Sequence, residues 1–418
     1  MGRPSGLAGV WGGAPHEMTV SRRDVLLAAA SAPLAALKRA GAAERVQITG
    51  LEVISIPVNV RGNWVFVQLR AGPSLVGLGE ASHGARGPRE TELERMRRAL
   101  EDLFPLIREK SPFDIEAFRL KAWPRVRKGG LIAATAASAL EQAMWDLAGK
   151  ALGAPVYELL GGKLRDRLPL YANVNRATNE RSPEEFAANA AKAVAQGFRA
   201  VKAAPFDDFP PLSSPPAELE AKRELGIRRI EAMRRAIGPR VDLLVDCHSH
   251  FDRALSIEVA RRLEPVSLYW YEEPVRPEQL DDTAAIKAAV KQKMAGGEVL
   301  FGVEGFEPLC RRRALDVIMP DVKHCGGILE GRKIAAVADV HGVVVSPHNP
   351  AGPVSTAASA QLCAGLANFG ILEYAWGEVD WRGDLVDPPE RISGGELVLS
   401  DRPGLGVALA PAALRRRA

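Results

Sequence analysis

Three acidic residues recur at equal intervals along the second half of the chain. Asp246, Glu272 and Glu298 lie 26 residues apart, and each lies at or near the end of a strand-like run, of which the last is the weakest. One strand, one helix and their loops take roughly 30 residues. The interval therefore places the three carboxylates at matching positions on successive parallel strands. At the C-terminal mouth of a β/α barrel they would converge on one point.

Three clustered carboxylates repel one another unless a cation lies between them. A set of oxygen ligands with room for water suits Mg²⁺. We therefore predict a magnesium site formed by Asp246, Glu272 and Glu298. Glu304 is an alternative third ligand, although it breaks the spacing, and Glu273 is expected to support the site rather than to bind the ion.

The sequence around these carboxylates alternates short apolar strands with amphipathic helices from Leu170 to about Tyr374. The expected strand ends are Asn173, Lys202, Asp246, Glu272, Glu298, Pro320, Pro347 and Glu373. Eight strands in this alternation indicate a barrel rather than an open sheet. Residues 206–216, rich in Pro, Ser and Asp, are expected to form an extended loop after the second strand.

A smaller α+β domain is expected before the barrel. Its predicted elements are strands at 46–56, 64–70 and 76–80 and helices at 90–110 and 132–152. We place this domain at residues 43–168 and the barrel at residues 169–376. Beyond Trp376 the chain becomes irregular, and residues 377–418 could return to complete the first domain.

The composition is that of an ordinary globular protein. The 418 residues are 47% hydrophobic and 25% charged with a net charge of +4, and part of the small basic excess lies at Arg415, Arg416 and Arg417. No nucleic-acid partner is therefore expected. After the N-terminus no apolar run reaches the roughly 20 residues that span a bilayer, so no membrane span is expected. The four cysteines lack Cys-x-x-Cys spacing, and buried free thiols are expected rather than disulfides.

The N-terminus resembles an export signal. The motif begins at Ser21-Arg22-Arg23, an apolar stretch runs through Leu37, and small residues follow at 40–42. We expect residues 1–42 to be a twin-arginine-type signal peptide and the protein to be periplasmic. Translation could begin at Met18. A short N-terminal helix beside chance arginines is the alternative, and the protein would then be cytoplasmic.

Two further polar residues end later strands. Asp321 follows the run from Val317, and His348 follows the run from Val343, so both would lie at the barrel mouth. A carboxylate there can hold an imidazole in one tautomer and raise its basicity. We therefore predict that His348 is a base supported by Asp321. Glu373, at the end of the last strand, could donate or accept a hydrogen bond near the substrate.

A second imidazole is expected to act as an acid. His248 follows Asp246 by two residues, so in an extended segment both side chains face the same way. The histidines at 83, 250, 324 and 341 are expected to be solvent-facing or loop residues without a catalytic role.

The stretch from Ala139 to Lys150, with Trp145-Asp146-Leu147-Ala148-Gly149-Lys150 at its end, resembles the domain-junction motif of the mandelate racemase group of the enolase superfamily. Pro155-Val156 and Leu159-Leu160-Gly161-Gly162 continue the resemblance, which covers nearly the whole chain after the leader. It implies a capping domain over a modified TIM barrel of (β/α)7β form. It also implies Mg²⁺ at the three carboxylates, abstraction of a proton α to a carboxylate, and a homo-oligomer.

One departure from this group narrows the chemistry. Many relatives carry Lys-x-Lys on the second strand, where the second Lys is a base on one face of the substrate. This chain has Lys202-Ala203-Ala204. Lys202 matches the first Lys and can balance charge, but Ala204 cannot take a proton. Racemases, epimerases and muconate-type cycloisomerases are therefore disfavoured, and His348 with Asp321 is the remaining base.

The Asp-x-His at Asp246 and His248 resembles the acid-sugar dehydratases of galactonate type, as does the run from His348 to Pro353. The resemblance implies loss of the β-hydroxyl from an acid sugar to give a 2-keto-3-deoxy acid, with His248 protonating the leaving hydroxyl. The alternatives are another one-base reaction of the superfamily (hydroxyproline-type dehydration, isomerisation or racemisation) and a non-catalytic periplasmic binding protein. The substrate-selecting loops are expected at residues 59–64 and 81–88.

Overall fold

A computed structural model describes residues 46–59, 62–83 and 89–415 of the chain. The predicted leader lies outside the described residues, so export and a periplasmic location stay predictions. Residues from Val46 onward form one compact unit. Within the described ranges, no helix has both the length and the apolar character needed to cross a membrane.

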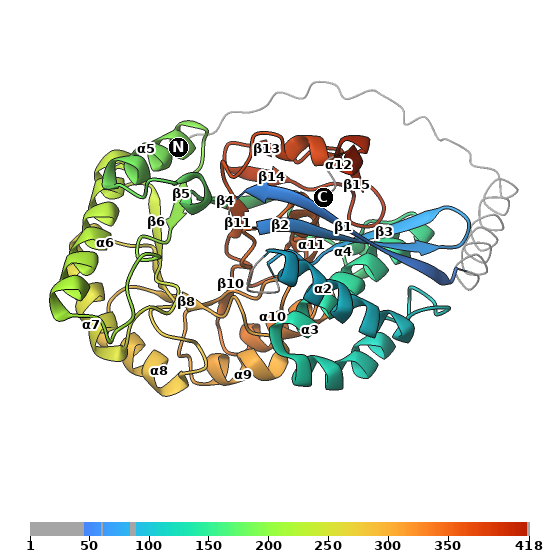
Figure 1. Cartoon of the computed structure of the whole chain (residues 1–418), viewed down its shortest axis with the longest axis horizontal. Helices are drawn as coiled ribbons and strands as arrows, with labels where there is room; N and C mark the ends of the chain where they lie inside the picture. The colour runs from blue at the N-terminus through green and yellow to red at the C-terminus, as the bar shows by residue number, and fades with distance from the viewer. Residues whose placement is uncertain (1–45, 60–61, 84–88, 416–418) are drawn as a thin grey trace, which may run out of the picture. The chain divides into compact units, whose positions relative to one another are not determined.

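The unit begins with an antiparallel sheet of β1 (Ile48–Asn59), β2 (Gly62–Ala71) and β3 (Leu75–Glu80). The helices α2 (Arg89–Leu103) and α3 (Ile115–Leu152) follow, with a short 3-10 helix at Phe104–Leu106 between them (Figure 1). Glycines bring β3 close to α3, because a Cβ at Gly79 would lie 2.0 Å from the carbonyl oxygen of Ala139. The predicted α+β arrangement is confirmed.

The helix α3 is longer than the sequence indicated. The pattern predicted a helix from Ile132 to Leu152. The chain is helical from Ile115, with an interruption confined to Gly130, which has φ 62° and ψ −149°. Two helical segments therefore meet at Gly130, and the predicted helix is the second of them.

Eight parallel strands form the barrel. They are β4 (Arg167–Asn173), β5 (Ala200–Ala203), β6 (Asp242–Asp246), β7 (Trp270–Glu272), β8 (Met294–Gly296), β9 (Val317–Ile318), β10 (Val344–Val345) and β11 (Leu372–Ala375). The first seven pair in chain order, and β11 pairs in parallel with β4, which brings the last strand beside the first. The short helix α4 (Val156–Leu159) lies between α3 and this barrel.

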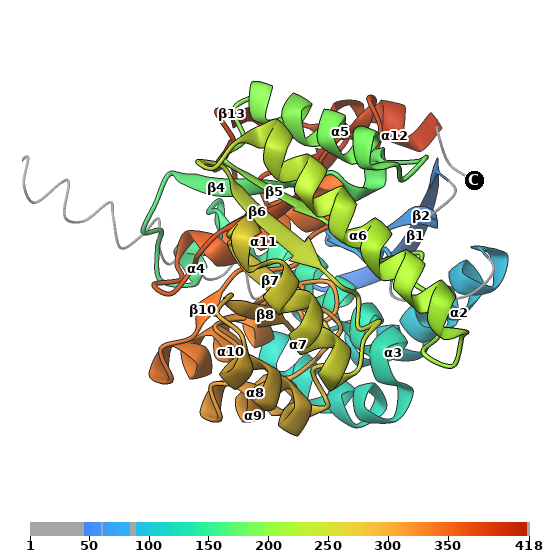
Figure 2. The same cartoon turned by 90° about the vertical axis from the view of Figure 1, so that its left-hand side faces the viewer.

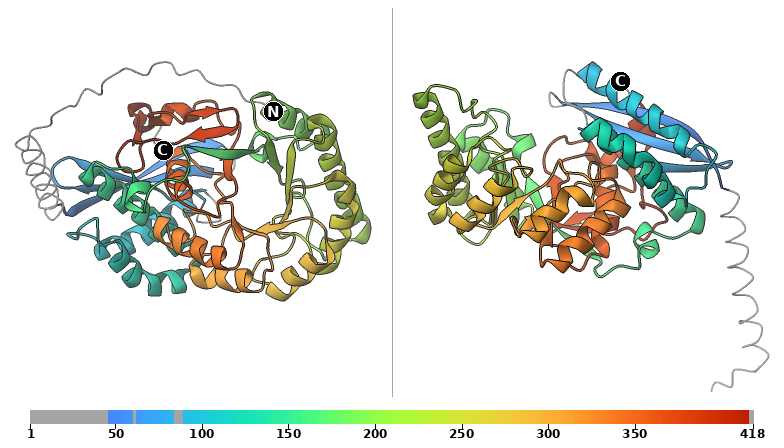
Figure 3. Two further views of the ribbon diagram at one scale, coloured as in Figure 1. Left: turned by 180° about the vertical axis from the view of Figure 1, so that it is seen from behind. Right: turned by 90° about the horizontal axis from the view of Figure 1, so that it is seen from below.

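Seven helices alternate with these strands. They are α5 (Pro183–Ala195), α6 (Pro216–Ile237), α7 (Arg253–Arg262), α8 (Leu280–Ala289), α9 (Val303–Arg311), α10 (Ile328–Val340) and α11 (Pro353–Ala364). Figure 2 shows α5 to α9 outside the strands, and Figure 3 shows the same helices from behind. The order of elements is (β/α)7β, as predicted.

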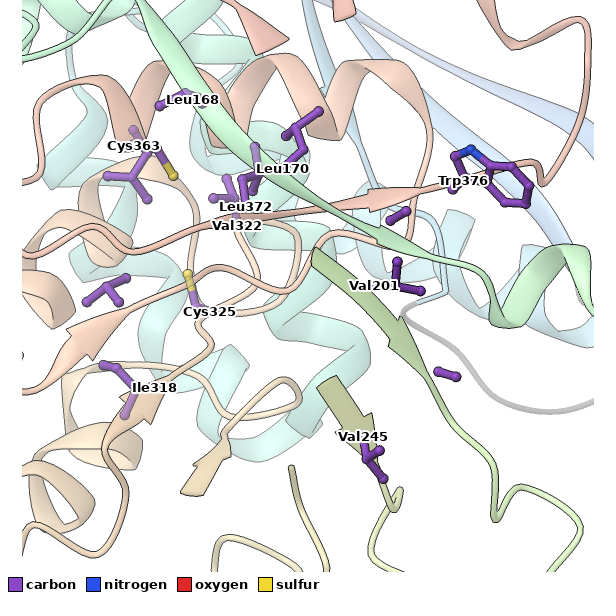
Figure 4. Close-up of a cluster of buried hydrophobic side chains, with 14 of the residues drawn as sticks. Leu168, Leu170, Val201, Val245, Ile318, Val322, Cys325, Cys363, Leu372 and Trp376 are labelled. Atoms are coloured by element: carbon purple, nitrogen blue, oxygen red, sulfur yellow. The ribbon is translucent and has the colours of Figure 1, made fainter. Parts of the chain in front are cut away.

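The direction of each strand side chain follows the period of two along a strand. Tyr171, Ala200, Leu244, Trp270 and Val317 form a small apolar cluster separate from the main core, which we assign to the barrel interior. Their neighbours in sequence belong to the main core. Figure 4 draws part of that core, including Leu170, Val201, Val245 and Ile318 from the strands and Cys363 from α11. Two residues beyond Tyr171, Ala200, Leu244 and Trp270, the next inward positions are polar, whereas Val317 is followed at this spacing by Met319 of the same apolar cluster.

The C-terminal segment contacts both halves of the unit. It contains β12 (Val386–Asp387), β13 (Ile392–Ser393), β14 (Glu396–Val398), β15 (Ala408–Leu409) and α12 (Pro411–Arg415), with a 3-10 helix at Arg382–Leu385. The strand β14 pairs antiparallel with β4. The backbone N–H of Leu405 donates to Asp146 on α3 at 2.8 Å. The exact domain boundaries stay a prediction, whereas the predicted free cysteines are confirmed, since all four are buried and unbridged.

Candidate active site

A cavity of about 280 Å³ opens at the C-terminal ends of the barrel strands. Polar side chains from the barrel loops line it, and residues of the first domain, His83, Glu92 and Leu131, complete its wall. Ligand sites in α/β barrels lie at this end of the strands, where the βα loops converge. The volume is near the low end for ligand pockets and suits a small molecule.

The three predicted metal ligands lie at adjoining strand ends. Asp246 ends β6 and Glu272 ends β7, and the two residues are partners in the register of these strands. Glu298 comes two residues after β8, beyond Gly297, whose φ of 104° turns the chain out of the strand period. The weak strand that the sequence indicated before Glu298 therefore ends earlier than the other two.

Lys202 from β5 lies among these carboxylates. Its Nζ is 3.0 Å from Asp246 Oδ2 and 3.6 Å from Glu373 Oε1, and it donates to Glu272 Oε1. All four side chains are buried. Burial opposes the charge of Lys202, but the adjacent carboxylates outweigh burial and raise the pKa of Lys202 well above its ordinary value. Lys202 is therefore a fixed positive charge rather than a base.

The carboxylates outnumber the lysine that faces them. Burial and the neighbouring Asp246 raise the pKa of Glu272 well above its ordinary value. Among the described residues, no hydrogen bond of good geometry reaches Asp246 Oδ2 or Glu298 Oε2, which are buried. Each oxygen instead lies within ion-pair distance of a lysine or histidine nitrogen. Buried carboxylate oxygens without a well-aligned donor suit a hard divalent cation, which takes oxygen ligands.

The described residues contain one group whose ligand atoms lie within 4.8 Å of one another, and its members are Asp246, His248 and Glu298. Glu272 is outside this group; Lys202 donates to one of its oxygens, and Trp270 Nε1 donates to the other at 2.8 Å. Two of the three predicted ligands are thus close enough to share an ion, and the third lies directly beside Asp246. Glu304 lies elsewhere and accepts from Trp123 Nε1 at 2.8 Å.

Glu273 supports the loop that carries Glu298. Its Oε1 accepts from the backbone N–H of Gly297 at 2.6 Å and of Glu298 at 3.3 Å. Burial and the charge of Glu298 raise the pKa of Glu273 to about 8. The geometry agrees with the supporting role that the sequence suggested.

His348 and Asp321 are in contact, as predicted. His348 Nδ1 lies 2.7 Å from Asp321 Oδ2, and Nε2 lies 3.1 Å from Glu298 Oε2. Lys323 donates to Asp321 through both its backbone N–H, at 2.7 Å, and its Nζ. Burial favours the neutral acid, but Lys323 and the nearby imidazoles outweigh it and lower the pKa of Asp321. Asp321 is therefore a charged acceptor that holds Nδ1 and directs Nε2 toward Glu298.

Glu373 is held on both oxygens. Asn173 Nδ2 donates to Oε1 at 2.6 Å, and the backbone N–H of Asn349 donates to Oε2 at 2.9 Å. The side chain is fully buried. The structure therefore places Glu373 beside Lys202 and next to the loop that carries His348.

His248 lies in the turn after β6, with φ 45°. Its Nε2 is 3.2 Å from Asp246 Oδ2, and its Nδ1 contacts Asp207 Oδ1. The side chain is 35% exposed, so it is open to the cavity. Burial lowers the pKa of His248, but Asp246 and Asp207 outweigh burial and raise it well above the ordinary value.

Several cavity residues were not predicted. Asp207 belongs to the loop after β5, and only the richness of that loop in Pro, Ser and Asp marked it. His83 and His324 lie in loops as expected, but both line the cavity. His324 Nδ1 is 2.9 Å from Thr135 Oγ1 on α3, and the buried Nδ1 of His83 has no hydrogen-bond partner in the part of the chain that the structure describes. Lys323, two residues after Asp321, could have been found by the same strand-end reasoning.

Comparison with known proteins gives a consistent result. The model of the mandelate racemase/muconate lactonizing enzyme N-terminal domain matches residues 44–161, and that of the enolase C-terminal domain-like family matches residues 185–413. A D-xylonate dehydratase of Haloferax volcanii is 31% identical over 88% of this chain and 88% of its own. A D-galactonate dehydratase of Variovorax paradoxus is 30% identical over 83% and 89%. A solved structure of an enolase superfamily member from Salmonella Typhimurium superposes with a TM-score of 0.80 at 27% identity, over 89% of this chain and 98% of the other.

Proposed function

Because the chain belongs to the mandelate racemase/muconate lactonizing enzyme family of the enolase superfamily, we propose that it dehydrates an acid sugar. The relatives are dehydratases, which are hydro-lyases, and the chain is an enzyme of this class. The proposed substrate is a monocarboxylic acid sugar of galactonate type, and the proposed product is a 2-keto-3-deoxy acid.

The observation that carries this proposal is the pair of imidazoles at one cavity. His348 is backed by Asp321, and His248 is backed by Asp207. A dehydration needs one base for the α-proton and one acid for the β-hydroxyl. Ala204, immediately after β5, leaves that strand without a second base, and Lys202 is held in ion pairs. One base and one acid favour elimination over racemisation.

We propose that Asp246, Glu272 and Glu298 hold Mg²⁺. The carboxylate ligands support this choice of ion, as do the buried oxygens of Asp246 and Glu298 that accept no well-aligned hydrogen bond from the described residues. When bound, Mg²⁺ would supply a Lewis acid for the negative charge that develops on the substrate carboxylate.

The chain's own residues would then act in two steps. His348 Nε2 takes the proton from the carbon α to the carboxylate, while Asp321 keeps Nδ1 protonated. His248 gives a proton to the β-hydroxyl, the C–O bond breaks, and water leaves. The resulting enol then becomes the 2-keto acid. Lys202 remains a fixed charge beside the carboxylates throughout.

A screen of five- and six-carbon acid sugars with Mg²⁺ tests the proposal. We expect at least one of these acid sugars to give a keto acid, which semicarbazide traps. Formation of this product distinguishes dehydration from isomerisation or racemisation. The variant His348→Asn should lose both keto-acid formation and exchange of the α-proton with solvent deuterium. Retained exchange in that variant would refute the assignment of His348 as the base.

We also propose, from the sequence alone, that the protein is exported to the periplasm and forms a homo-oligomer. Fractionation of cells that express the full chain would test the first point, with Arg22→Lys and Arg23→Lys together as the matched control. Sedimentation equilibrium would test the second.

A further inference from the structure

The loop between β5 and α6 brings a carboxylate to the cavity. Asp207 lies four residues after the last residue of β5 and is 24% exposed as a side chain. Its Oδ1 contacts His248 Nδ1, although the two residues are 41 positions apart in the sequence. The contact forms a second histidine–carboxylate pair at the cavity, beside that of His348 and Asp321.

The other oxygen of Asp207 is held by two donors. Asn175 Nδ2 donates to Oδ2 at 2.9 Å, and Arg181 Nη1 lies 3.4 Å from it. Arg181 is itself fixed, since it donates to Asn175 Oδ1 at 3.0 Å and to the carbonyl oxygen of Ala204 at 2.6 Å. Asp207 therefore cannot turn away from His248 without losing these contacts.

The loop has a separate anchor at the next residue. Asp208 Oδ1 accepts from Arg229 Nη1 at 2.5 Å and Oδ2 accepts from Lys222 Nζ at 2.8 Å. Arg229 on α6 is buried and also donates to the carbonyl oxygens of Arg181 and Pro205. Asp208 and Arg229 thus hold the loop in place, while Asp207 points to the cavity.

The contact decides which nitrogen of His248 can serve the reaction. With Nδ1 occupied by Asp207, Nε2 is the nitrogen on the side of Asp246. A carboxylate on one ring nitrogen fixes the tautomer and the ring orientation, as in other histidine–carboxylate pairs. Without it, the half-exposed ring of His248 could turn about its side-chain bonds.

We propose that Asp207 is a positioning residue that directs His248 Nε2 at the β-hydroxyl of the substrate. This inference rests on the proposed dehydration and on the role of His248 in it. Asp207 acts only on the second half of the reaction, in which the C–O bond breaks. It has no part in removal of the α-proton by His348.

The variant Asp207→Asn tests this separation. Asn175 and Arg181 both donate to the position of Oδ2, so they would claim the amide oxygen and turn the amide NH₂ toward His248 Nδ1. Two donors would then face each other whenever Nδ1 carries a proton. We expect keto-acid formation to fall roughly 10- to 100-fold, the usual range for a residue that orients a functional side chain.

Three measurements distinguish positioning from a structural role. Exchange of the α-proton with solvent deuterium in recovered substrate should continue in Asp207→Asn at close to the wild-type rate of proton removal. A 3-deoxy-3-fluoro analogue of the substrate should restore elimination, because fluoride leaves without a proton. Asp207→Glu, which keeps the carboxylate, should recover part of the lost rate.

Asp208→Asn is the matched control in the same loop. In this variant the rates of α-proton exchange and of elimination should change by the same factor. The positioning role is refuted if Asp207→Asn loses α-proton exchange and elimination together. It is also refuted if the variant does not eliminate fluoride from the fluoro analogue, or if its rate of keto-acid formation equals that of the wild type. A wild-type protein that forms no keto acid from any acid sugar would instead refute the proposed function. An unfolded variant would fail with the fluoro analogue as well, and circular dichroism would identify it.

Discussion

At the scale of single residues, the period of two along a strand explains most of the predicted site. Lys202, Asp246 and Glu272 each lie two residues after an interior apolar residue of the same strand, so they face the barrel axis. This rule could be applied from the sequence once the strands were placed. Glu298 does not follow this rule, because the chain turns at Gly297. Only its interval of 26 residues from Glu272 indicated that it belongs to the site.

The residues that sequence reasoning missed depend on contacts between distant parts of the chain. Asp207 meets His248 only because the loop after β5 folds over the cavity, and no periodicity describes that loop. His83 comes from the first domain and reaches the cavity through the packing of that domain. A histidine without a polar partner nearby in the sequence is expected to have no catalytic role, because the sequence does not show which distant residues surround it.

We predict that His83→Ala weakens substrate recognition. His83 lines the cavity, and its buried Nδ1 has no hydrogen-bond partner among the described residues, so we expect a substrate hydroxyl to be its partner. Loss of one neutral hydrogen bond costs about 1 kcal/mol, or roughly fivefold in kcat/KM. Steady-state kinetics on the best acid sugar should show this loss mainly in KM. His341→Ala, at the end of α10 and away from the cavity, should be unchanged, and an equal effect of both variants would contradict the assignment.

At the scale of elements, three of the five barrel helices that lack a side-chain cap of their own begin after a glycine. The helices α9, α10 and α11 start after Gly302, Gly327 and Gly352, whereas α5 and α7 have capping side chains at Ser182 and Asp252. Orphan N–H groups at a helix start need acceptors. Carboxylates from elsewhere supply them.

Glu80 at the end of β3 accepts from the backbone N–H of Gly352 and of Ser355, at 2.7 and 2.8 Å, at the start of α11. Glu141 on α3 accepts from Ile328 and Leu329 at the start of α10, both at 2.8 Å. The first domain thus caps two barrel helices. The sequence could not show this, because the partners are 187 to 275 residues apart.

We predict that Glu80→Ala is strongly destabilising. It would leave two buried N–H groups without acceptors, and each costs roughly 1–3 kcal/mol, so a loss of about 3 kcal/mol or more is expected. Glu80→Gln keeps one accepting oxygen and should lose less. The free energy of unfolding in urea measures both. Glu94→Ala, on the exposed side of α2, should change it by under about 0.5 kcal/mol, and a similar small change for Glu80→Ala would refute the capping role.

The loop anchor at Asp208 gives a prediction about pH. Burial would raise the pKa of Asp208, but Arg229 and Lys222 outweigh it and lower the pKa below its ordinary value. In the unfolded chain an Asp titrates near about 3.9. The stabilisation is therefore fully present above that pH and is lost as pH falls through the lower, folded pKa. The difference in melting temperature between wild type and Asp208→Asn should be constant from neutral pH to about pH 5 and should shrink below about pH 4. A difference that grows in acid would contradict this sign.

At the scale of the whole unit, the alternation of elements was sufficient to predict an eight-stranded barrel, and the family resemblance implied its (β/α)7β order. Strand lengths were less accessible, since β9 and β10 have two residues each and their polar residues come three positions later. The local sequence pattern cannot predict where so short a strand ends, because the end of the strand is set by its pairing with the neighbouring strands. Asp321 and His348 could nevertheless be predicted, because each is a polar residue that follows an apolar run.

The carboxylate cluster predicts a response of the whole fold to metal. An ion bound to the folded state alone stabilises it by about 2.7 kcal/mol at a concentration 100 times Kd. Added Mg²⁺ should therefore raise the melting temperature of the purified protein, and EDTA should reverse the increase. Glu298→Gln should remove most of the increase. An undiminished response in that variant would show that the ion binds elsewhere.

The capping of α10 and α11 by Glu141 and Glu80 has a consequence for engineering. A chimera that joins the first domain of one dehydratase to the barrel of another must keep a hydrogen-bond acceptor at both positions. Otherwise the backbone N–H groups at the starts of α10 and α11 would have no acceptor. Exchange of residues 59–64 alone, one of the two segments expected to select the substrate, leaves these contacts intact. Recombination between family members should therefore tolerate crossovers within this segment better than crossovers at the domain junction.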